Sequence, residues 1–328
     1  MSSRATDNLR HYIRNAHLPE MRMAHTAFSN PPDLLLSTQP SRCRNFMDVY
    51  TLNSFKFNKY VAVWSEKHIP NASLGVGDID KLTGEYFSIP CLPQISVPLL
   101  PLLRPDNIDG LLMWMSHYPV ETVRRALHIL YPETDSWNFI PDNGGADRAI
   151  FRSLSWSQNA KDTGLTLRRS SINIYIQPPW VLSTADLEDF STSQSVRPQL
   201  HVFSSEWPGI NPVYPSQGQQ QLWDKIWDMC ISKDSPWFMI STYSHWVFGV
   251  FSAGWTTAFV SPVYSWDSQD PSILELLLFW FISSMGLPGG WQIPEIRLEP
   301  AYPRQLPAAA AYDIAAAGIP KAMALSAM

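Results

Sequence analysis

The sequence predicts an α+β fold, in which a mixed or antiparallel sheet has flanking helices and the connections are rich in loops and proline. Three observations support this class. Residues 236–266 contain no Asp, Glu, Lys or Arg and are rich in β-branched and aromatic side chains, which is typical of short buried strands. Residues 171–181 (SINIYIQPPWV) alternate isoleucines on one face, as a strand does. Residues 219–231 have an apolar stripe at helical spacing.

The first hundred residues predict few regular elements. A weak helix is expected over residues 8–16, and we interpret residues 1–40 as a partly ordered arm. Val61 to Trp64 is the best strand candidate before residue 88, because its apolar residues are contiguous. Five prolines between residues 90 and 105 predict an extended connector, since proline breaks both helices and central strands.

Helices and turns alternate in the middle of the chain. One short helix is expected from Asp106, at the cap position, to Ser116, and a second over residues 120–130, with prolines on either side. Residues 136–162 predict turns, and a short helix follows Ser183. Residues 200–203 are a further strand candidate. On the helix at 219–231, Leu222, Trp223, Ile226, Trp227 and Cys230 are expected to face inward, with Asp224, Lys225 and Asp228 facing outward.

The charge-free stretch predicts a β-meander followed by a helix. Turn formers at residues 243–245 and 252–254 divide it into three strands. The helix over residues 271–285 is expected to have Asp270 as its N-cap and Gly286 as its C-terminal stop. A membrane hairpin is the alternative, but this helix would span only ~22 Å of a ~30 Å hydrocarbon layer, and it contains Glu275. We therefore expect a buried core that includes Trp223, Trp227, Phe248, Val250, Leu277 and Trp280.

These elements suggest one globular domain over residues 41–298, with its core at 171–286. Residues 299–328 are rich in Ala and Pro and have few large side chains to bury, which predicts a mobile tail that is dispensable for folding. No repeat is visible.

Composition narrows the classes of function. The net charge is −5 and charged residues make up 16% of the chain. The overall electrostatic potential of the protein therefore does not favour binding of nucleic acid. Small basic groups, such as Arg10 with Arg14, are interpreted as solvated faces. Three well-separated cysteines predict no disulfide framework, and the N-terminus has no secretory h-region. We expect a soluble cytoplasmic or nuclear protein that does not bind membranes, although the Arg- and Ser-containing N-terminus is also compatible with mitochondrial targeting.

Motifs for catalysis, cofactors or metals are not found in the sequence, so no cofactor and no metal ligand is predicted and the catalytic residues are unknown. His245, in a turn between two apolar strands, is expected to bond locally rather than act as a base. If a hydrolytic site exists, it would have to be assembled from distant residues such as Asp142, Asp147, His245 and Asp267.

Two resemblances come from the pattern of elements and from particular segments. Strand 172–176, helix 219–231 and strands 237–242 and 246–251 resemble the order in PD-(D/E)XK nuclease-like folds. That family has Glu-x-Lys at the end of the first strand, where this chain has Ile176-Gln177-Pro178-Pro179, so the resemblance implies a degenerate metal site. The segments IYIQPPWVLS, STYSHWVFGVFSAGWTTAFVSPV and ILELLLFWFISSMGLPG resemble an uncharacterised family of basidiomycete fungal proteins over about residues 40–295. That likeness implies no activity.

Two hypotheses of function follow from these patterns. The first is an interaction or scaffold module with a protein partner, because an extensive core lacks a visible cluster of acid, base or nucleophile. The alternative is a hydrolase of nuclease-like fold with a degenerate or non-standard site.

Overall fold

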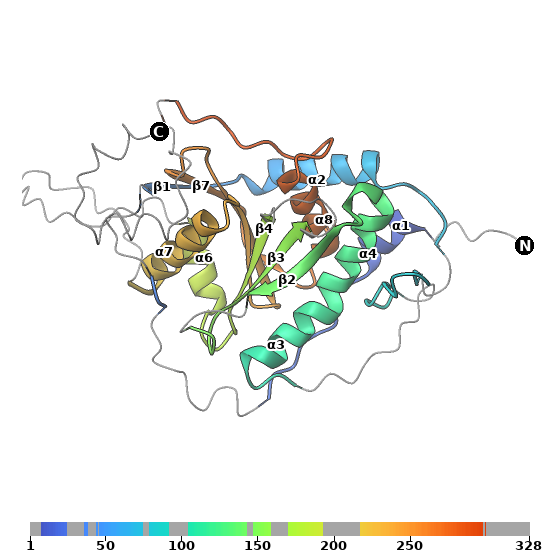
Figure 1. The fold of residues 1–328 in the computed structure, drawn as a ribbon, viewed down its shortest axis with the longest axis horizontal. Helices are drawn as coiled ribbons and strands as arrows, with labels where there is room; N and C mark the ends of the chain where they lie inside the picture. Colours follow the sequence, from blue (N-terminus) through green and yellow to red (C-terminus); the bar gives the residue numbers. More distant parts are fainter. Residues whose placement is uncertain are drawn as a thin grey trace, which may run out of the picture.

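The computed structural model describes residues 8–24, 36–38, 44, 46–74, 79–91, 104–142, 147–158, 170–192, 217–297 and 299. Within them the predicted α+β class is confirmed: a mixed eight-stranded sheet has helices packed on both faces (Figure 1). The expected strand at residues 200–203 and, apart from Glu299, the expected tail at 299–328 lie outside the described residues. That residues 41–298 form a single domain stays a prediction.

The sheet has the strand order β1-β7-β6-β5-β4-β3-β2, and β8 pairs with β6. The pairs β1–β7 and β4–β5 are parallel, and the remaining pairs are antiparallel. The strands are β1 Asp48–Thr51, β2 Trp137–Asp142, β3 Arg152–Gln158, β4 Ser170–Ile176, β5 Trp237–Ser241, β6 His245–Phe251, β7 Thr257–Val260 and β8 Tyr264–Ser265.

The charge-free stretch forms the predicted meander as β5, β6 and β7, followed by the short β8. Gly249 shows how tightly it packs, because an added Cβ there would lie 2.2 Å from Cζ of Phe238 on the neighbouring strand. Phe238 is itself fully buried. A glycine is therefore required at position 249 by close approach across the sheet.

Residues 136–162, which the sequence predicts to be rich in turns, contain the strands β2 and β3 that it does not predict. Serines at positions 153, 155 and 157 of β3 alternate with Leu154 and Trp156. Leu154 and Trp156 pack in the core on one face of the sheet. The serines concealed the strand because serine has little strand propensity, although the alternation itself has the period of a strand.

The helices are α1 Leu9–Asn15, α2 Ser54–His68, α3 Ile108–Met115, α4 Glu121–Leu130, α6 Thr184–Thr192, α7 Gln217–Ser232 and α8 Ile273–Ser284. The sequence predicts all of them except α2. A π-helical turn at Ser116–Val120 joins α3 to α4, so the two form one continuous rod rather than two separate helices (Figure 1). Pro119 lies inside this turn, and the N-cap of α3 is Asn107 rather than Asp106.

The strand expected at Val61 to Trp64 is instead the middle of α2. Phe57, Val61 and Trp64 are buried, whereas Ala62 and Val63 are exposed. Buried positions at i, i+4 and i+7 have the helical period, and this signal outweighs the local run of apolar residues.

The N-cap of α8 also differs from the prediction. Ser272, not Asp270, is the cap: its hydroxyl accepts from the backbone nitrogen of Glu275 (3.1 Å), and the Glu275 carboxylate accepts from the backbone nitrogen of Ser272 (3.1 Å). This reciprocal capping box has the sequence signature Ser-x-x-Glu. Gly286, with φ of +68°, follows the last turn as predicted.

Two buried clusters flank the sheet. One joins α1, α2, α3, α4 and α8 to the face carrying Ile172 and Phe248, and the other joins α6 and α7 to the opposite face. All six side chains predicted to be buried are 2% exposed or less: Trp223, Trp227, Phe248, Val250, Leu277 and Trp280. The helix expected in the N-terminal arm is present as α1, but it lies within the first cluster rather than outside the core.

Helix α7 has the predicted apolar stripe, but its polar side is less exposed than expected. Asp228 is buried, and Asp224 is largely so, because both carboxylates bind Arg44. In the described ranges, no helix is both long and apolar enough to cross a membrane.

Candidate functional site

Three helices meet at the first turn of α8, where one buried carboxylate connects them. Oε1 of Glu275 accepts from the hydroxyl of Ser65 on α2 (2.6 Å) and from Nε of Arg14 on α1 (3.1 Å). The Ser272 hydroxyl donates to the carbonyl of Ile13 (2.7 Å), which ties α1 to α8 a second time. These bonds hold α1 and α2 in fixed positions around the start of α8.

Arg14 is oriented by two carboxylates. Its Nη2 donates to Oε2 of Glu66 at 2.9 Å, in addition to the bond from Nε to Glu275. Partial burial acts to lower the pKa of Arg14, but the hydrogen bonds and charges of Glu275 and Glu66 outweigh this effect and raise it. The guanidinium is therefore a charged group of defined position.

An open cleft of about 750 Å³ lies beside this cluster. Its size falls within the ~300–1,000 Å³ typical of ligand pockets. Its walls come from the C-terminal half of α1, the first half of α2 and the segment that enters α8. They consist of Arg14, Asn15, His17, Phe55, Asn58, Lys59, Ala62, Gln269, Asp270, Pro271 and Glu275.

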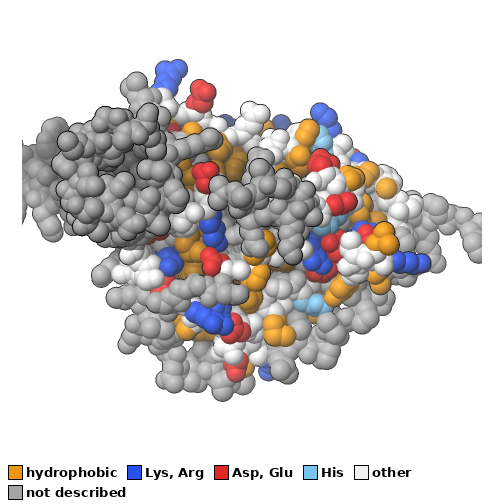
Figure 2. Space-filling model, viewed as in Figure 1, with side chains coloured by type: hydrophobic (Ala, Val, Ile, Leu, Met, Phe, Trp, Pro, Cys, Tyr) orange, Lys and Arg blue, Asp and Glu red, His pale blue; other side chains and the backbone are white. Residues whose placement is uncertain are grey.

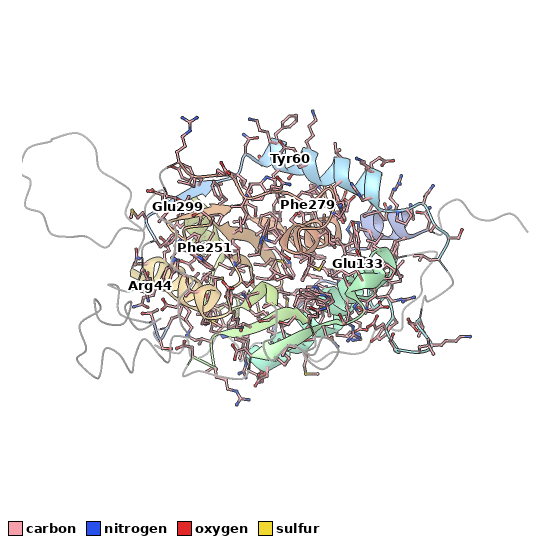
Figure 3. All side chains as sticks on the ribbon, turned by 45° about the horizontal axis from the view of Figure 1, so that its top comes forward. Arg44, Tyr60, Glu133, Phe251, Phe279 and Glu299 are labelled. Carbon is pink, nitrogen blue, oxygen red and sulfur yellow. The ribbon has the colours of Figure 1, made fainter. Side chains whose placement is uncertain are left out.

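The outward side of α2 continues the cleft wall over the rest of the helix. Three of the eight large hydrophobic side chains that are exposed among the described residues lie on α2: Phe55, Tyr60 and Val63. Figure 3 places Tyr60 on the outer side of the helix and Phe279 beneath it in the interior. We call this surface the α2 face and define it by Phe55, Lys56, Lys59, Tyr60, Val63 and Lys67.

The lysines of the α2 face are not neutralised. Over the described ranges, Lys56, Lys59 and Lys67 form no ion pair, and all three are exposed. The one acid on α2, Glu66, is bound instead to Arg10 and Arg14. The α2 face is therefore positive and partly apolar.

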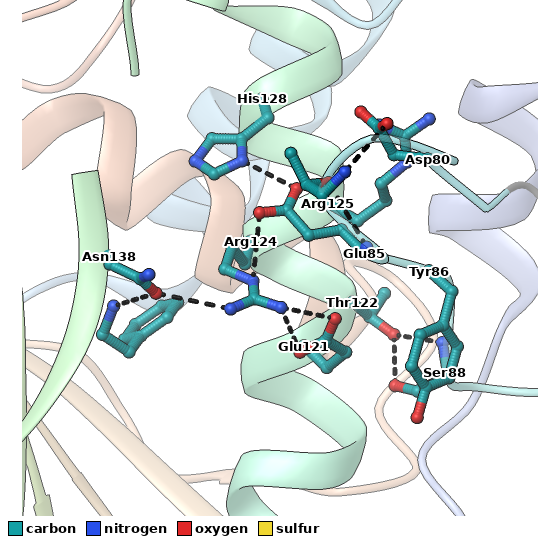
Figure 4. Close-up of polar contacts among 12 residues, drawn as sticks. Asp80, Glu85, Tyr86, Ser88, Glu121, Thr122, Arg124, Arg125, His128 and Asn138 are labelled. Atoms are coloured by element: carbon teal, nitrogen blue, oxygen red, sulfur yellow. Dashed lines mark hydrogen bonds and ion pairs between the residues drawn. The ribbon is translucent and has the colours of Figure 1, made fainter. Parts of the chain in front are cut away.

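On the side that carries α3, α4 and β2, acidic and basic side chains lie next to one another (Figure 2). A polar network there connects α4 to residues 79–91 (Figure 4). Arg124 bonds Glu121 (2.7 Å) and lies 3.4 Å from Glu85, whose other oxygen bonds Nδ1 of His128 at 2.8 Å. Nε2 of His128 is closed off from solvent, so the Glu85–His128 pair has no access to a substrate.

The structure distributes the four residues named as a hypothetical hydrolytic site among different partners. Asp142 pairs with Lys233 at 3.2 Å and Asp147 with Lys225 at 2.7 Å, whereas His245 lies elsewhere, at the start of β6. In the described part of the chain, no group of three His, Cys, Asp or Glu side chains is arranged to hold a metal ion.

The backbone of His245 forms a local bond, whereas its ring contacts a residue that is distant in sequence. Its backbone nitrogen donates to the Thr242 hydroxyl (3.2 Å), and its ring lies 3.4 Å from the hydroxyl of Thr184. Burial lowers the pKa of His245, while the charges of Glu188 and Asp267 act in the opposite direction. The electrostatic interaction with Asp267 links two members of the hypothetical site.

One serine–lysine contact resembles a nucleophile with its base. Nζ of Lys233 lies 2.9 Å from Oγ of Ser155, but it also contacts the carboxylate of Asp142. A lysine can act as a general base only as the neutral amine, and an adjacent carboxylate favours the charged ammonium. This contact therefore fits a structural role, in which Lys233 satisfies buried serines of β3.

Sequence reasoning missed the residues that build the cleft. The signals were present: Arg10 and Arg14 are four residues apart on a predicted helix, and Ser272 and Glu275 have capping-box spacing. What could not be anticipated is that Glu66 and Glu275, distant in sequence, would orient those arginines.

Comparison with family models, curated proteins and solved structures finds no match for this chain. The resemblances to a fungal family and to nuclease-like folds therefore stay predictions, and a function has to be inferred from the geometry.

Proposed function

We propose that this chain is a binding module that docks an acidic segment of a partner protein on its α2 face. The observation that carries the proposal is that one helix has on its outer side both three exposed apolar side chains and three lysines without an ion-pair partner among the described residues. The inner side of the same helix is anchored by Phe57, Val61 and Trp64, so the surface is held on a rigid support.

The chemistry of the partner follows from this surface. Carboxylates are the partner groups that match the charges of Lys56, Lys59 and Lys67. Electrostatic attraction between these opposite charges would also speed the association of the two proteins. Phe55, Tyr60 and Val63 offer apolar area, and aromatic side chains are enriched at the centres of interfaces. A segment with acidic residues beside an apolar stripe satisfies both requirements.

The shape of the surface favours a protein over an anionic bilayer. The cleft beside Phe55 and Lys59 is concave and has a volume of about 750 Å³. A side chain of a docked segment can enter this hollow, whereas a planar headgroup layer cannot.

The test uses a fluorescent amphipathic helical peptide of about five turns, with glutamates flanking a leucine stripe. We expect its anisotropy to report binding that weakens as salt rises from about 50 to about 300 mM, because exposed charges are screened. The triple variant Lys56→Glu, Lys59→Glu, Lys67→Glu should bind at least about tenfold more weakly.

The matched control is Lys81→Glu, which reverses one exposed lysine outside the α2 face and should leave the peptide affinity within about twofold. Equal binding by wild type and the triple variant would refute the proposal. So would binding to phosphatidylserine vesicles with no binding of the peptide, since that result would assign the surface to a membrane.

A further inference from the structure

A second, smaller hollow lies on the outer side of α1 and shares Arg14 and Asn15 with the cleft. Its volume is about 310 Å³. The described residues that line it supply two guanidiniums, one imidazole and three amides, and none of them has a carboxylate. Its members are Asn8, Arg10, His11, Arg14, Asn15 and Asn71.

The two arginines of this hollow are held side by side by a single acid. Glu66 accepts from Nη1 of Arg10 through Oε1 (2.7 Å) and from Nη2 of Arg14 through Oε2 (2.9 Å). Nε of Arg10 donates to the carbonyl of Ile69 (2.8 Å), and Nε of Arg14 donates to Glu275 (3.1 Å). Among the described residues, Nη2 of Arg10 and Nη1 of Arg14 have no acceptor, so each arginine retains one available terminal NH₂ group.

His11 contributes a further donor. The side-chain nitrogen of Asn15 lies 3.2 Å from Nδ1 of His11 and donates to it. With Nδ1 accepting, the proton of a neutral ring is assigned to Nε2 from the hydrogen-bonding pattern. Side chains that carry N–H donors therefore line the hollow from Arg10, His11, Arg14 and the exposed Asn71.

We propose that this hollow binds the phosphate group of a phosphate ester. Arginine forks match phosphate oxygens geometrically, and a tetrahedral oxyanion can accept from three or more converging donors, whereas a carboxylate has two oxygens. Glu66 and Glu275 balance the charges of Arg10 and Arg14. Binding of the phosphate therefore depends more on hydrogen bonds from correctly placed N–H groups than on a net positive charge. The hollow is also larger than one phosphate, which leaves room for the esterified group.

The site does not depend on the function proposed for the α2 face. The ester can be a phosphorylated side chain of a protein or a free phosphorylated metabolite, because both present the same oxyanion. The two sources differ in what is attached to the phosphate, and this difference separates them in an experiment.

The test is calorimetric titration of the full chain with three probes: inorganic phosphate, a phosphoserine peptide and glycerol phosphate. We expect saturable binding of at least one ester, and the tighter ester identifies the source. Arg10→Gln and His11→Gln should each weaken binding of that ester at least about tenfold, since each removes a directed donor. Thermal unfolding of each variant without ligand checks that it is folded.

The matched control is Lys59→Gln, which removes one positive charge from the neighbouring cleft without touching the hollow. It should change ester affinity less than about twofold if directed donors are decisive. The proposal is overturned if neither ester binds, if a folded Arg10→Gln variant binds as well as wild type, or if Lys59→Gln weakens binding as much as Arg10→Gln does. Loss of acidic-peptide binding with intact ester binding would refute the α2 proposal alone.

Discussion

The surroundings of α7 and the outer face of α2 use positive charge in opposite ways. Beside α7, Arg44 lies between Asp224 and Asp228 and is 5% exposed in its side chain, and Lys225 contacts Asp147 at 2.7 Å. On α2, the lysines project into solvent without acidic partners among the described residues.

This difference separates charges that hold the fold together from charges available to another molecule. A buried ion pair has lost its water, so each partner depends on the other. An exposed lysine keeps its hydration and contributes little to stability. If the contrast is correct, substitutions near α7 should change stability, and substitutions on the α2 face should change binding alone.

The largest effects are expected from the buried side of α7. Asp228→Ala should cost about 3–5 kcal/mol, because Arg44 loses the carboxylate that accepts from its Nε (2.9 Å) and Nη2 (2.7 Å). Denaturant unfolding measures the loss. The triple variant Asp224→Leu, Asp228→Leu, Arg44→Met should recover most of it, since no member of this ion-pair cluster is then charged. A loss below about 0.5 kcal/mol in the single variant would show that the pair is not structural.

Trp227 tests the apolar side of the same helix. It is 2% exposed, and its indole nitrogen donates to the carbonyl of Trp255 at 3.0 Å. Trp227→Ala should cost about 3–5 kcal/mol, because it leaves a cavity and removes the hydrogen bond to the carbonyl of Trp255. An unfolding free energy within about 0.5 kcal/mol of wild type would contradict the packing of α7 on the sheet.

Asp147 sharpens the comparison through pH. Burial acts to raise its pKa, but Lys225 and Ser37 outweigh it, so the pKa of Asp147 lies below its usual value. The stabilisation is therefore fully present above about pH 4 and is lost as pH falls through the lowered pKa. Asp147→Asn should be less stable at neutral pH, with the difference shrinking in acid. A difference in the free energy of unfolding between the two proteins that stays constant down to about pH 2 would disprove this linkage.

The smallest effect on stability is expected on α2. Lys56→Ala, Lys59→Ala and Lys67→Ala together should leave the free energy of unfolding within about 0.5 kcal/mol of wild type, because exposed unpaired lysines stabilise little. Thermal and denaturant unfolding check this. A decrease of more than about 1 kcal/mol in the free energy of unfolding would show that these lysines stabilise the fold, as the charged residues beside α7 do.

The sequence predicts the core better than the surface. Alternating isoleucines identify β4, and the apolar stripe identifies α7, because burial imposes a period that one chain segment displays by itself. β3 was missed because its alternate positions are serines, which become satisfied only when Lys233 and Asn173 approach from elsewhere.

The cleft and the hollow depend on still longer-range partners. Glu275 meets Arg14 across 261 positions and Ser65 across 210. No local pattern specifies such meetings. The predicted strand at Val61 to Trp64 also gives no indication that Val63 faces solvent, which follows only from the helical period of α2.

The most direct test of the central claim places a photo-crosslinking amino acid at position 60, on the α2 face, or at position 82, whose leucine is 97% exposed in the turn at residues 79–86. Both sites are solvent-accessible, so they differ in location rather than in exposure. Irradiation with the acidic amphipathic peptide should give a crosslink from position 60 that high salt abolishes, and little from position 82. Equal crosslinking from both positions, or a crosslink from position 82 alone, would contradict the assignment of the α2 face as the docking surface.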